Sequence, residues 1–124
     1  MPKSSSKLFG RNTSRLPSIR PQEAWERLTE DVQSYVLIDV REHWEFQWRH
    51  VRGSHNIPLS QFRKRLDEVP IDREVLLLCL SGHRSIVAGK MLQGREATRV
   101  VNIRGGVIAW LRHRLPMEVF PKNK

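Results

Sequence analysis

The stretch EVLLLCLSGHRS, residues 74–85, passes from hydrocarbon to polar chemistry within a few positions and holds Cys79, the only cysteine of the chain. Its first half is a short apolar run, which is typical of a strand buried on both faces of a parallel sheet. Its second half is a polar, glycine-containing segment. Ligands of parallel α/β sheets bind at the carboxyl ends of the strands. Cys79 is therefore either the last buried residue of a strand or a nucleophile at the strand's end.

The segments on both sides of this stretch alternate between strand and helix patterns. Strands or extended pieces are predicted over residues 17–20, 35–40, 55–60, 74–80 and 98–103. Helices are predicted over 21–31, 60–69, 84–94 and 105–115, with a short helix or turn within 41–53. The packing faces of the second and third of these helices are assigned to Phe62, Leu66 and Val69, and to Ile86, Val87, Met91 and Leu92. This alternation predicts an α/β domain with a parallel sheet.

The length and composition of the chain limit the classes of protein to which it can belong. A chain of 124 residues predicts one domain. No apolar run approaches the roughly 20 residues of a membrane-spanning helix, so we expect no membrane partner. One cysteine cannot form an internal disulfide, which favours a reducing, cytoplasmic setting. One cysteine and five scattered histidines lack the spacing of a metal site, and we expect neither a metal nor a cofactor.

The net charge of +9 is concentrated at the two ends of the chain. Residues 1–20 carry +5 and residues 112–124 carry +3, so only +1 remains for residues 21–111. A nucleic-acid-binding domain would normally carry its charge on the folded face, which argues against that partner. We expect residues 1–17 to be a basic, disordered tail and 116–124 a C-terminal tail. A targeting segment and a partner-binding arm are alternative interpretations of the first tail.

The loop after Cys79 has the chemistry of an anion site. Ser81 and Gly82 can form a tight turn whose backbone N–H groups point inward, and a helix starting near Arg84 aims its positive end at the same place. The guanidinium of Arg84 adds a fixed cation. Such surroundings favour the thiolate form of a cysteine, which is the nucleophilic form. His83 lies inside the loop, where its titration near neutral pH would change the local charge.

Three motifs of this sequence resemble those of the rhodanese family of sulfurtransferases. CLSGHRS, residues 79–85, resembles the family's active-site loop Cys-x-x-Gly-x-Arg-Ser. IDVREHWEFQWRHVRGSHNIP, residues 38–58, resembles its upstream signature, and RGGVIAW, residues 104–110, resembles its Gly-Gly-x-x-x-Trp segment. The three motifs occur in the family's order, and the resemblance covers about residues 18–115.

The resemblance implies a five-stranded parallel sheet flanked by helices on both faces, and a persulfide-forming Cys79. It also implies a loop that binds the persulfide or substrate through Leu80, Ser81, Gly82, His83, Arg84 and Ser85. The expected supporting residues are Asp39, Arg41, Gly105 and Gly106. Asp39 is either a turn-capping carboxylate or an acceptor for Arg84 or loop N–H groups, and Gly105 and Gly106 allow close approach of the backbone. Arg41 either orients donor anions or, as we favour, pairs with Glu42 or Glu45.

The loop length separates two chemistries within this resemblance. Four residues lie between Cys79 and Arg84, whereas cysteine phosphatases have five, so the resemblance implies sulfur transfer. A cysteine phosphatase, an arsenate reductase and a non-catalytic interaction module are the alternatives.

Leu80 stands where the family often has Arg or Lys, and this departure leaves the sulfur donor open. The donor is either a small anion such as thiosulfate or a persulfide-carrying protein. We expect a thiol or a protein as the sulfur acceptor, and a monomer. Because the chain has no second cysteine, release of the sulfur must be intermolecular.

Overall fold

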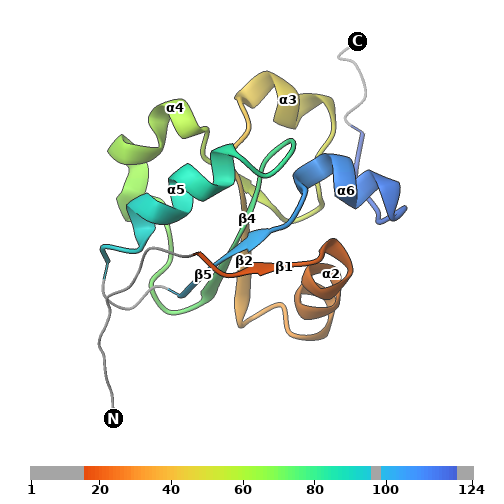
Figure 1. Cartoon of the computed structure of the whole chain (residues 1–124), viewed down its shortest axis with the longest axis horizontal. Helices are drawn as coiled ribbons and strands as arrows, with labels where there is room; N and C mark the ends of the chain where they lie inside the picture. The colour runs from red at the N-terminus through yellow and green to blue at the C-terminus, as the bar shows by residue number, and fades with distance from the viewer. Residues whose placement is uncertain (1–15, 96–98, 120–124) are drawn as a thin grey trace.

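A five-stranded parallel sheet forms the centre of the computed structural model, which describes residues 16–95 and 99–119. The strands are β1 (Ser18–Ile19), β2 (Tyr35–Asp39), β3 (His55–Asn56), β4 (Glu74–Leu78) and β5 (Arg99–Ile103). Their order across the sheet is β1-β5-β4-β2-β3, and Figure 1 shows β1 beside β5. They are connected by α2 (Pro21–Glu30), α3 (His43–Trp48), α4 (Leu59–Phe62), the 3₁₀ helix η1 (Arg63–Glu68), α5 (Arg84–Leu92) and α6 (Gly106–Arg112). The predicted α/β fold with five parallel strands is confirmed.

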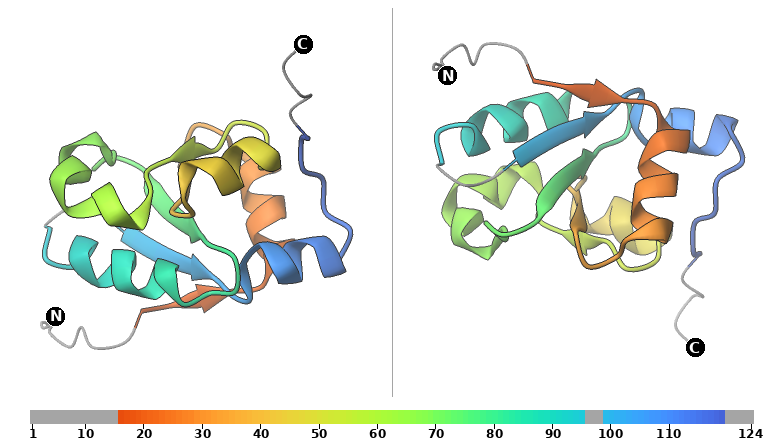
Figure 2. Two further views of the ribbon diagram at one scale, coloured as in Figure 1. Left: turned by 90° about the horizontal axis from the view of Figure 1, so that it is seen from above. Right: turned by 90° about the horizontal axis from the view of Figure 1, so that it is seen from below.

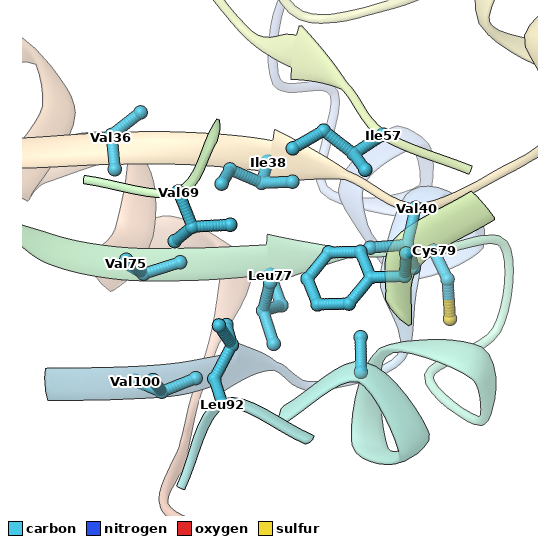
Figure 3. Packing of buried hydrophobic residues seen from close by; sticks show 12 residues of the cluster. Val36, Ile38, Val40, Ile57, Val69, Val75, Leu77, Cys79, Leu92 and Val100 are labelled. Atoms are coloured by element: carbon cyan, nitrogen blue, oxygen red, sulfur yellow. The ribbon is translucent and has the colours of Figure 1, made fainter. Parts of the chain in front are cut away.

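The central strands β2, β4 and β5 bury hydrophobic side chains on both faces of the sheet, as their hydrophobic runs predict. Successive side chains point to opposite faces, so β4 contributes Val75 and Leu77 to one core and Leu76 and Leu78 to the other. The first core, shown in Figure 3, also contains side chains of α4 and α5. The second core contains side chains of α2 and α6. In Figure 2, α4 and α5 lie between the sheet and the viewer in the view from above, and α2 lies between the sheet and the viewer in the view from below.

Helix α5 packs through only part of the face that the sequence predicts: Leu92 is buried and Met91 packs against the first core. Ile86 and Val87 are exposed, so their predicted packing role is wrong. The buried face consists of Ser85, Ala88, Gly89 and Leu92. Small residues let the helix backbone lie close to its neighbours, and a Cβ atom at position 89 would collide with the side chain of Leu16.

The segment 60–69, predicted as one amphipathic helix, is instead divided into α4 and η1. Arg65 has φ −115° and ψ 22°, outside the helical region. The guanidinium of Arg95 donates to the carbonyl oxygens of Leu66 and Val69 at 2.7 and 3.1 Å, which gives these carbonyls partners outside a regular helix. The assignment of Phe62 and Val69 to the buried face is nevertheless confirmed.

Both ends of the described chain contact the domain beyond the predicted limits of 18 and 115. Leu16 packs against the first core, and the carbonyl of Pro17 accepts a hydrogen bond from the backbone of Asn102 at 2.8 Å. At the other end, Glu118 forms a two-residue antiparallel bridge with His50. The rest of the predicted tails, 1–15 and 120–124, lies outside the described residues. Among the described helices, none is long and apolar enough to cross a membrane.

Candidate active site

Cys79 directly follows β4 and is only 1% exposed. Figure 3 shows its sulfur pointing away from the strand, toward the loop that leads into α5. The carbonyl of Cys79 accepts a hydrogen bond from the N–H of Val107 at 2.7 Å, and the carbonyl of Leu80 accepts one from Ile108 at 3.0 Å. The first turn of α6 therefore holds the backbone of the loop from one side.

The two glycines before α6 make this close contact possible. A Cβ atom on Gly106 would lie within 2.6 Å of the backbone of Leu80, closer than any side chain tolerates. Gly105 has φ +77° and Gly106 has φ +62°, a left-handed backbone conformation that favours glycine. The expectation that these glycines allow close backbone approach agrees with this geometry.

Two polar groups of the described residues contact the sulfur of Cys79. The backbone N–H of Gly82 donates to Sγ at 3.0 Å, and the hydroxyl oxygen of Ser85 lies 3.4 Å away. Gly82 has φ +105°, a left-handed backbone conformation that favours glycine, and it turns the chain from the loop toward α5. The N-terminus of α5 begins at Arg84, so the positive end of the helix lies close to the same loop. This arrangement stabilises negative charge on the sulfur.

Ser85 and Asn102 continue the polar contacts below the sulfur. The hydroxyl of Ser85 donates to the amide oxygen of Asn102, whose Nδ2 in turn donates to the hydroxyl of Ser18 at 3.2 Å. Ser85 is fully buried and Asn102 is 3% exposed. Sequence reasoning placed Ser85 in the loop but missed Asn102, because nothing in a strand pattern marks a buried amide as a partner of the site.

The guanidinium of Arg84 is paired with Glu45 rather than free. Its two terminal nitrogens donate to the two carboxylate oxygens of Glu45 at 2.8 and 3.0 Å. These hydrogen bonds lower the pKa of Glu45 and raise the pKa of Arg84; attraction to the sulfur of Cys79 adds a smaller upward shift to the pKa of Arg84. The Arg84 cation is therefore fixed in place, as expected, but its charge is largely compensated by Glu45.

Sequence reasoning did not select Glu45 as a site residue. Its signal was present, because Glu45 falls inside the matched upstream motif and forms a capping box with Glu42 at the start of α3. A capping box predicts only a local role. The contact with Arg84 spans 39 positions and becomes visible only in the fold.

Asp39 and Arg41 form a closed pair beside the site. The carboxylate of Asp39 accepts hydrogen bonds from the backbone N–H of Arg41 at 2.9 Å and from its guanidinium at 2.8 to 3.1 Å. Arg41 is 1% exposed and also donates to the carbonyl of Arg49. Of the two interpretations of Asp39, the structure supports the turn-capping carboxylate. The hydrogen-bonded partner of Arg41 is Asp39 rather than the expected Glu42 or Glu45, although the charge of Arg41 also lowers the pKa of Glu45. The expected structural role of Arg41 agrees with this geometry.

The remaining loop side chains face outward. Leu80 is 39% exposed, and the hydroxyl of Ser81 lies 3.1 Å from Nδ1 of the exposed His83. His83 therefore contacts the loop rather than the sulfur. Within residues 16–95 and 99–119, no group of three or more His, Cys, Asp or Glu side chains could hold a metal ion.

Comparisons with known proteins agree with this geometry. The Rhodanese-like domain family matches residues 20–113, and the chain belongs to that family. It is 37% identical over 87 residues to a sulfurtransferase of Allochromatium vinosum, covering 70% of this chain and 81% of that protein. It is 31% identical over 101 residues to the thiosulfate sulfurtransferase GlpE of Glaesserella parasuis, covering 82% and 92%. A rhodanese-related protein of Thermoplasma volcanium superposes with a TM-score of 0.73 at 28% identity, covering 85% and 99%.

Proposed function

We propose that this protein is a sulfurtransferase in which Cys79 carries the transferred sulfur as a persulfide. The observation that carries the proposal is the hydrogen bond of 3.0 Å from the N–H of Gly82 to the sulfur, at the N-terminal end of α5. A backbone donor and a helix end stabilise an anionic sulfur, and the chemistry passes through anionic sulfur at every stage. The names of the relatives support the same class of reaction.

The reaction has two nucleophilic displacements at sulfur. The Cys79 thiolate attacks the outer sulfur of thiosulfate, a new S–S bond forms, and the bond to the sulfonate sulfur breaks with release of sulfite. The electron pair of the broken bond leaves with sulfite, and Cys79 becomes a persulfide anion. A nucleophilic acceptor such as cyanide or a thiolate then attacks the outer sulfur, and the Cys79 thiolate leaves. No external oxidant or reductant is needed in either step.

The loop offers little net charge for holding a small dianion. Glu45 compensates Arg84, and the exposed side chain at position 80 is a leucine. We therefore propose that thiosulfate reacts but binds weakly. A persulfide-carrying protein is the second donor class, because a protein can bind through contacts outside the loop.

The setting of this activity is also part of the proposal. The chain has one cysteine, so its persulfide must be passed to another molecule, either a small thiol or a protein. A persulfide is stable only where it is not oxidised, which fits the cytoplasm. We propose that the protein acts as a monomer there.

Steady-state assays with thiosulfate as the donor and cyanide as the acceptor test this proposal. We expect thiocyanate to form, with a high Michaelis constant for thiosulfate, and we expect Cys79→Ser to abolish turnover. An aryl phosphate serves as the control substrate, because the loop is one residue shorter than a phosphatase loop. Robust phosphate hydrolysis that depends on Cys79, or equal thiocyanate formation by Cys79→Ser, would contradict the proposal.

A further inference from the structure

A buried chain of polar side chains leads from the sulfur of Cys79 to the first strand. The hydroxyl oxygen of Ser85 lies 3.4 Å from Sγ and donates to Oδ1 of Asn102. Nδ2 of Asn102 donates to the hydroxyl of Ser18 at 3.2 Å. Asn102 and Ser18 are register partners in the pairing of β5 with β1, so the sheet itself holds the end of this chain in place.

The hydroxyl of Ser85 has one hydrogen and more than one acceptor near it. The carbonyl of Gly82 lies 3.3 Å from it, and the amide oxygen of Asn102 is its closest acceptor. With its hydrogen on Asn102, Ser85 presents only a lone pair to the sulfur of Cys79. A lone pair can accept the hydrogen of a thiol, but it offers nothing to a thiolate. In this arrangement Ser85 therefore adds no donor for a thiolate beside the N–H of Gly82.

The same chain can run in the opposite direction without losing a hydrogen bond between its members. Serine hydroxyls and the asparagine amide both donate and accept, and the two ends of the amide have nearly the same shape. A half-turn of the Asn102 amide places Nδ2 toward Ser85 and Oδ1 toward Ser18. Ser85 then accepts from Asn102 and donates its own hydrogen to the sulfur. Ser18 is partly exposed, so its hydroxyl can reorient in contact with water.

We propose that Asn102 is a positioning residue for Cys79, and that its amide reverses the direction of this chain when the sulfur becomes a thiolate. The thiol proton leaves to solvent, and Ser85 becomes a second donor beside the N–H of Gly82. The reversed chain stabilises Cys79 both as the attacking thiolate and as the leaving thiolate in the second displacement. This inference rests on the proposed function for its role in sulfur transfer. The hydrogen-bond reversal itself does not depend on that function.

Other charged groups lie around the loop, and the test must leave their charges unchanged. They are His83 in the loop, Arg84 of α5, Glu45 of α3, and the Asp39–Arg41 pair after β2. Within the described part of the chain, none of these groups is hydrogen-bonded to Ser85 or Asn102, so a substitution at Asn102 removes none of their contacts. A neutral substitution such as Asn102→Leu also adds no charge to the set.

The test is a pH titration of the thiolate by its ultraviolet absorbance in the full chain, with Cys79→Ser as the blank. Cys79 is the only cysteine, so the signal reports this sulfur alone. Asn102→Leu should move the midpoint of the thiolate titration upward by about one pH unit, because one hydrogen bond to an anion is lost. At a fixed pH below the midpoint, the thiolate fraction should then be about tenfold smaller. Ser85→Ala should give a similar shift. The midpoint of the double variant, with both Asn102→Leu and Ser85→Ala, should shift no further than the midpoint of Ser85→Ala alone, because Asn102 acts through Ser85.

Two controls separate this effect from loosening of the strand. Val101→Ala removes buried volume from the neighbouring position of β5 on its other face, and it should leave the midpoint unchanged. Ser18→Ala, at the partly exposed end of the chain, should move the midpoint upward by less than Asn102→Leu. If Asn102→Leu fails to fold, the midpoint of Ser18→Ala tests the proposal in its place.

The proposal is overturned if Asn102→Leu leaves the midpoint in place, if it still shifts the midpoint in the Ser85→Ala background, or if Val101→Ala has the same effect. For an Asn102→Leu protein that does not fold, an unshifted midpoint in Ser18→Ala overturns it. The absorbance titration involves no sulfur donor. Failure of sulfur transfer with the expected midpoint shifts would therefore contradict the proposed function alone.

Discussion

Two arginine–carboxylate pairs lie at the carboxyl edge of the sheet, and they differ in how far water reaches them. The side chains of Arg41 and Asp39 are 1% and 0% exposed, whereas those of Arg84 and Glu45 are 31% and 11% exposed. The shortest hydrogen bond is 2.8 Å in both pairs. The two pairs therefore have equal shortest contact distances but differ strongly in their exposure to water.

The difference separates a structural role from a role at the site. The closed pair lies within three residues of one turn and also binds the backbone of Arg41 and the carbonyl of Arg49, so it fixes how the chain leaves β2. The open pair joins α3 to α5 across the loop, and the charge of Arg84 still acts on the sulfur of Cys79. We infer that the closed pair supports the fold and that the open pair sets the charge of the loop.

The largest expected effect comes from breaking the closed pair with Asp39→Asn. This change leaves the charge of Arg41 buried without a counter-charge, so the free energy of unfolding should fall by about 3–5 kcal/mol. Chemical denaturation measures the loss. Asp67→Asn, at an exposed position, is the matched control and should change stability by less than about 0.5 kcal/mol. A loss at Asp39 no greater than that of the control would show that the pair does not support the fold.

Breaking the open pair with Glu45→Gln should have a smaller effect on stability and a distinct effect on kinetics. We expect a loss of about 1 kcal/mol, because the pair is partly exposed. The unmasked charge of Arg84 should lower the Michaelis constant for thiosulfate several-fold, as measured in steady-state assays. Glu68→Gln removes an acid from the exposed pair with Arg65 and should leave the constant unchanged. A rise in the constant for Glu45→Gln would mean that Glu45 positions Arg84 rather than masking it.

Adding a cation to the loop with Leu80→Arg tests the same charge from the opposite side. Leu80 is exposed, so the added attraction for a dianionic donor should be on the order of 1 kcal/mol. The Michaelis constant for thiosulfate should fall accordingly, and high salt should remove most of the gain. Leu80→Gln is the uncharged control. An equal improvement in the control, or a gain that persists in high salt, would refute the account of the loop charge.

The smallest expected effect is the pH dependence of the open pair. The pKa of Glu45 is held below its ordinary value of 4.5 by its hydrogen bonds to Arg84. A carboxylate with a lowered pKa stabilises the folded state above its ordinary pKa, and this contribution disappears as the pH falls through its folded value. The difference in stability between the wild type and Glu45→Gln should therefore be constant near neutral pH and shrink below about pH 4.5, in denaturation curves recorded across that range. A difference that stays constant into acid would contradict the pKa shift.

The sequence predicted the sheet and the position of Cys79 because those features follow local rules. Continuous apolar runs such as Val75–Leu78 have few alternatives to a buried strand, and the residue after such a strand lies at the edge where sites form. The glycines at 105 and 106 were also identifiable, because a pair of glycines before a helix indicates a close backbone approach. Each of these predictions depends on neighbours within a few positions.

The partners of the charged residues were harder to predict, because they depend on how distant segments meet. Asp39 was considered for Arg84, but Arg41 lies closer along the same turn and occupies both carboxylate oxygens. Glu45 and Asn102 reach the site from α3 and β5, 39 and 17 positions from their partners. The buried face of α5 was misjudged at Ile86 and Val87, because a hydrophobic side chain alone does not show which face of a short helix touches the sheet.

The intact mass of the protein after incubation with thiosulfate tests the central claim most directly. In the proposed reaction, the sulfur of Cys79 is the atom that receives the transferred sulfur. We predict that the wild-type mass rises by one sulfur atom, that cyanide removes this addition, and that Cys79→Ser shows no addition under the same conditions. An equal addition in Cys79→Ser, or an unchanged wild-type mass with both thiosulfate and a protein persulfide as donors, would contradict the account.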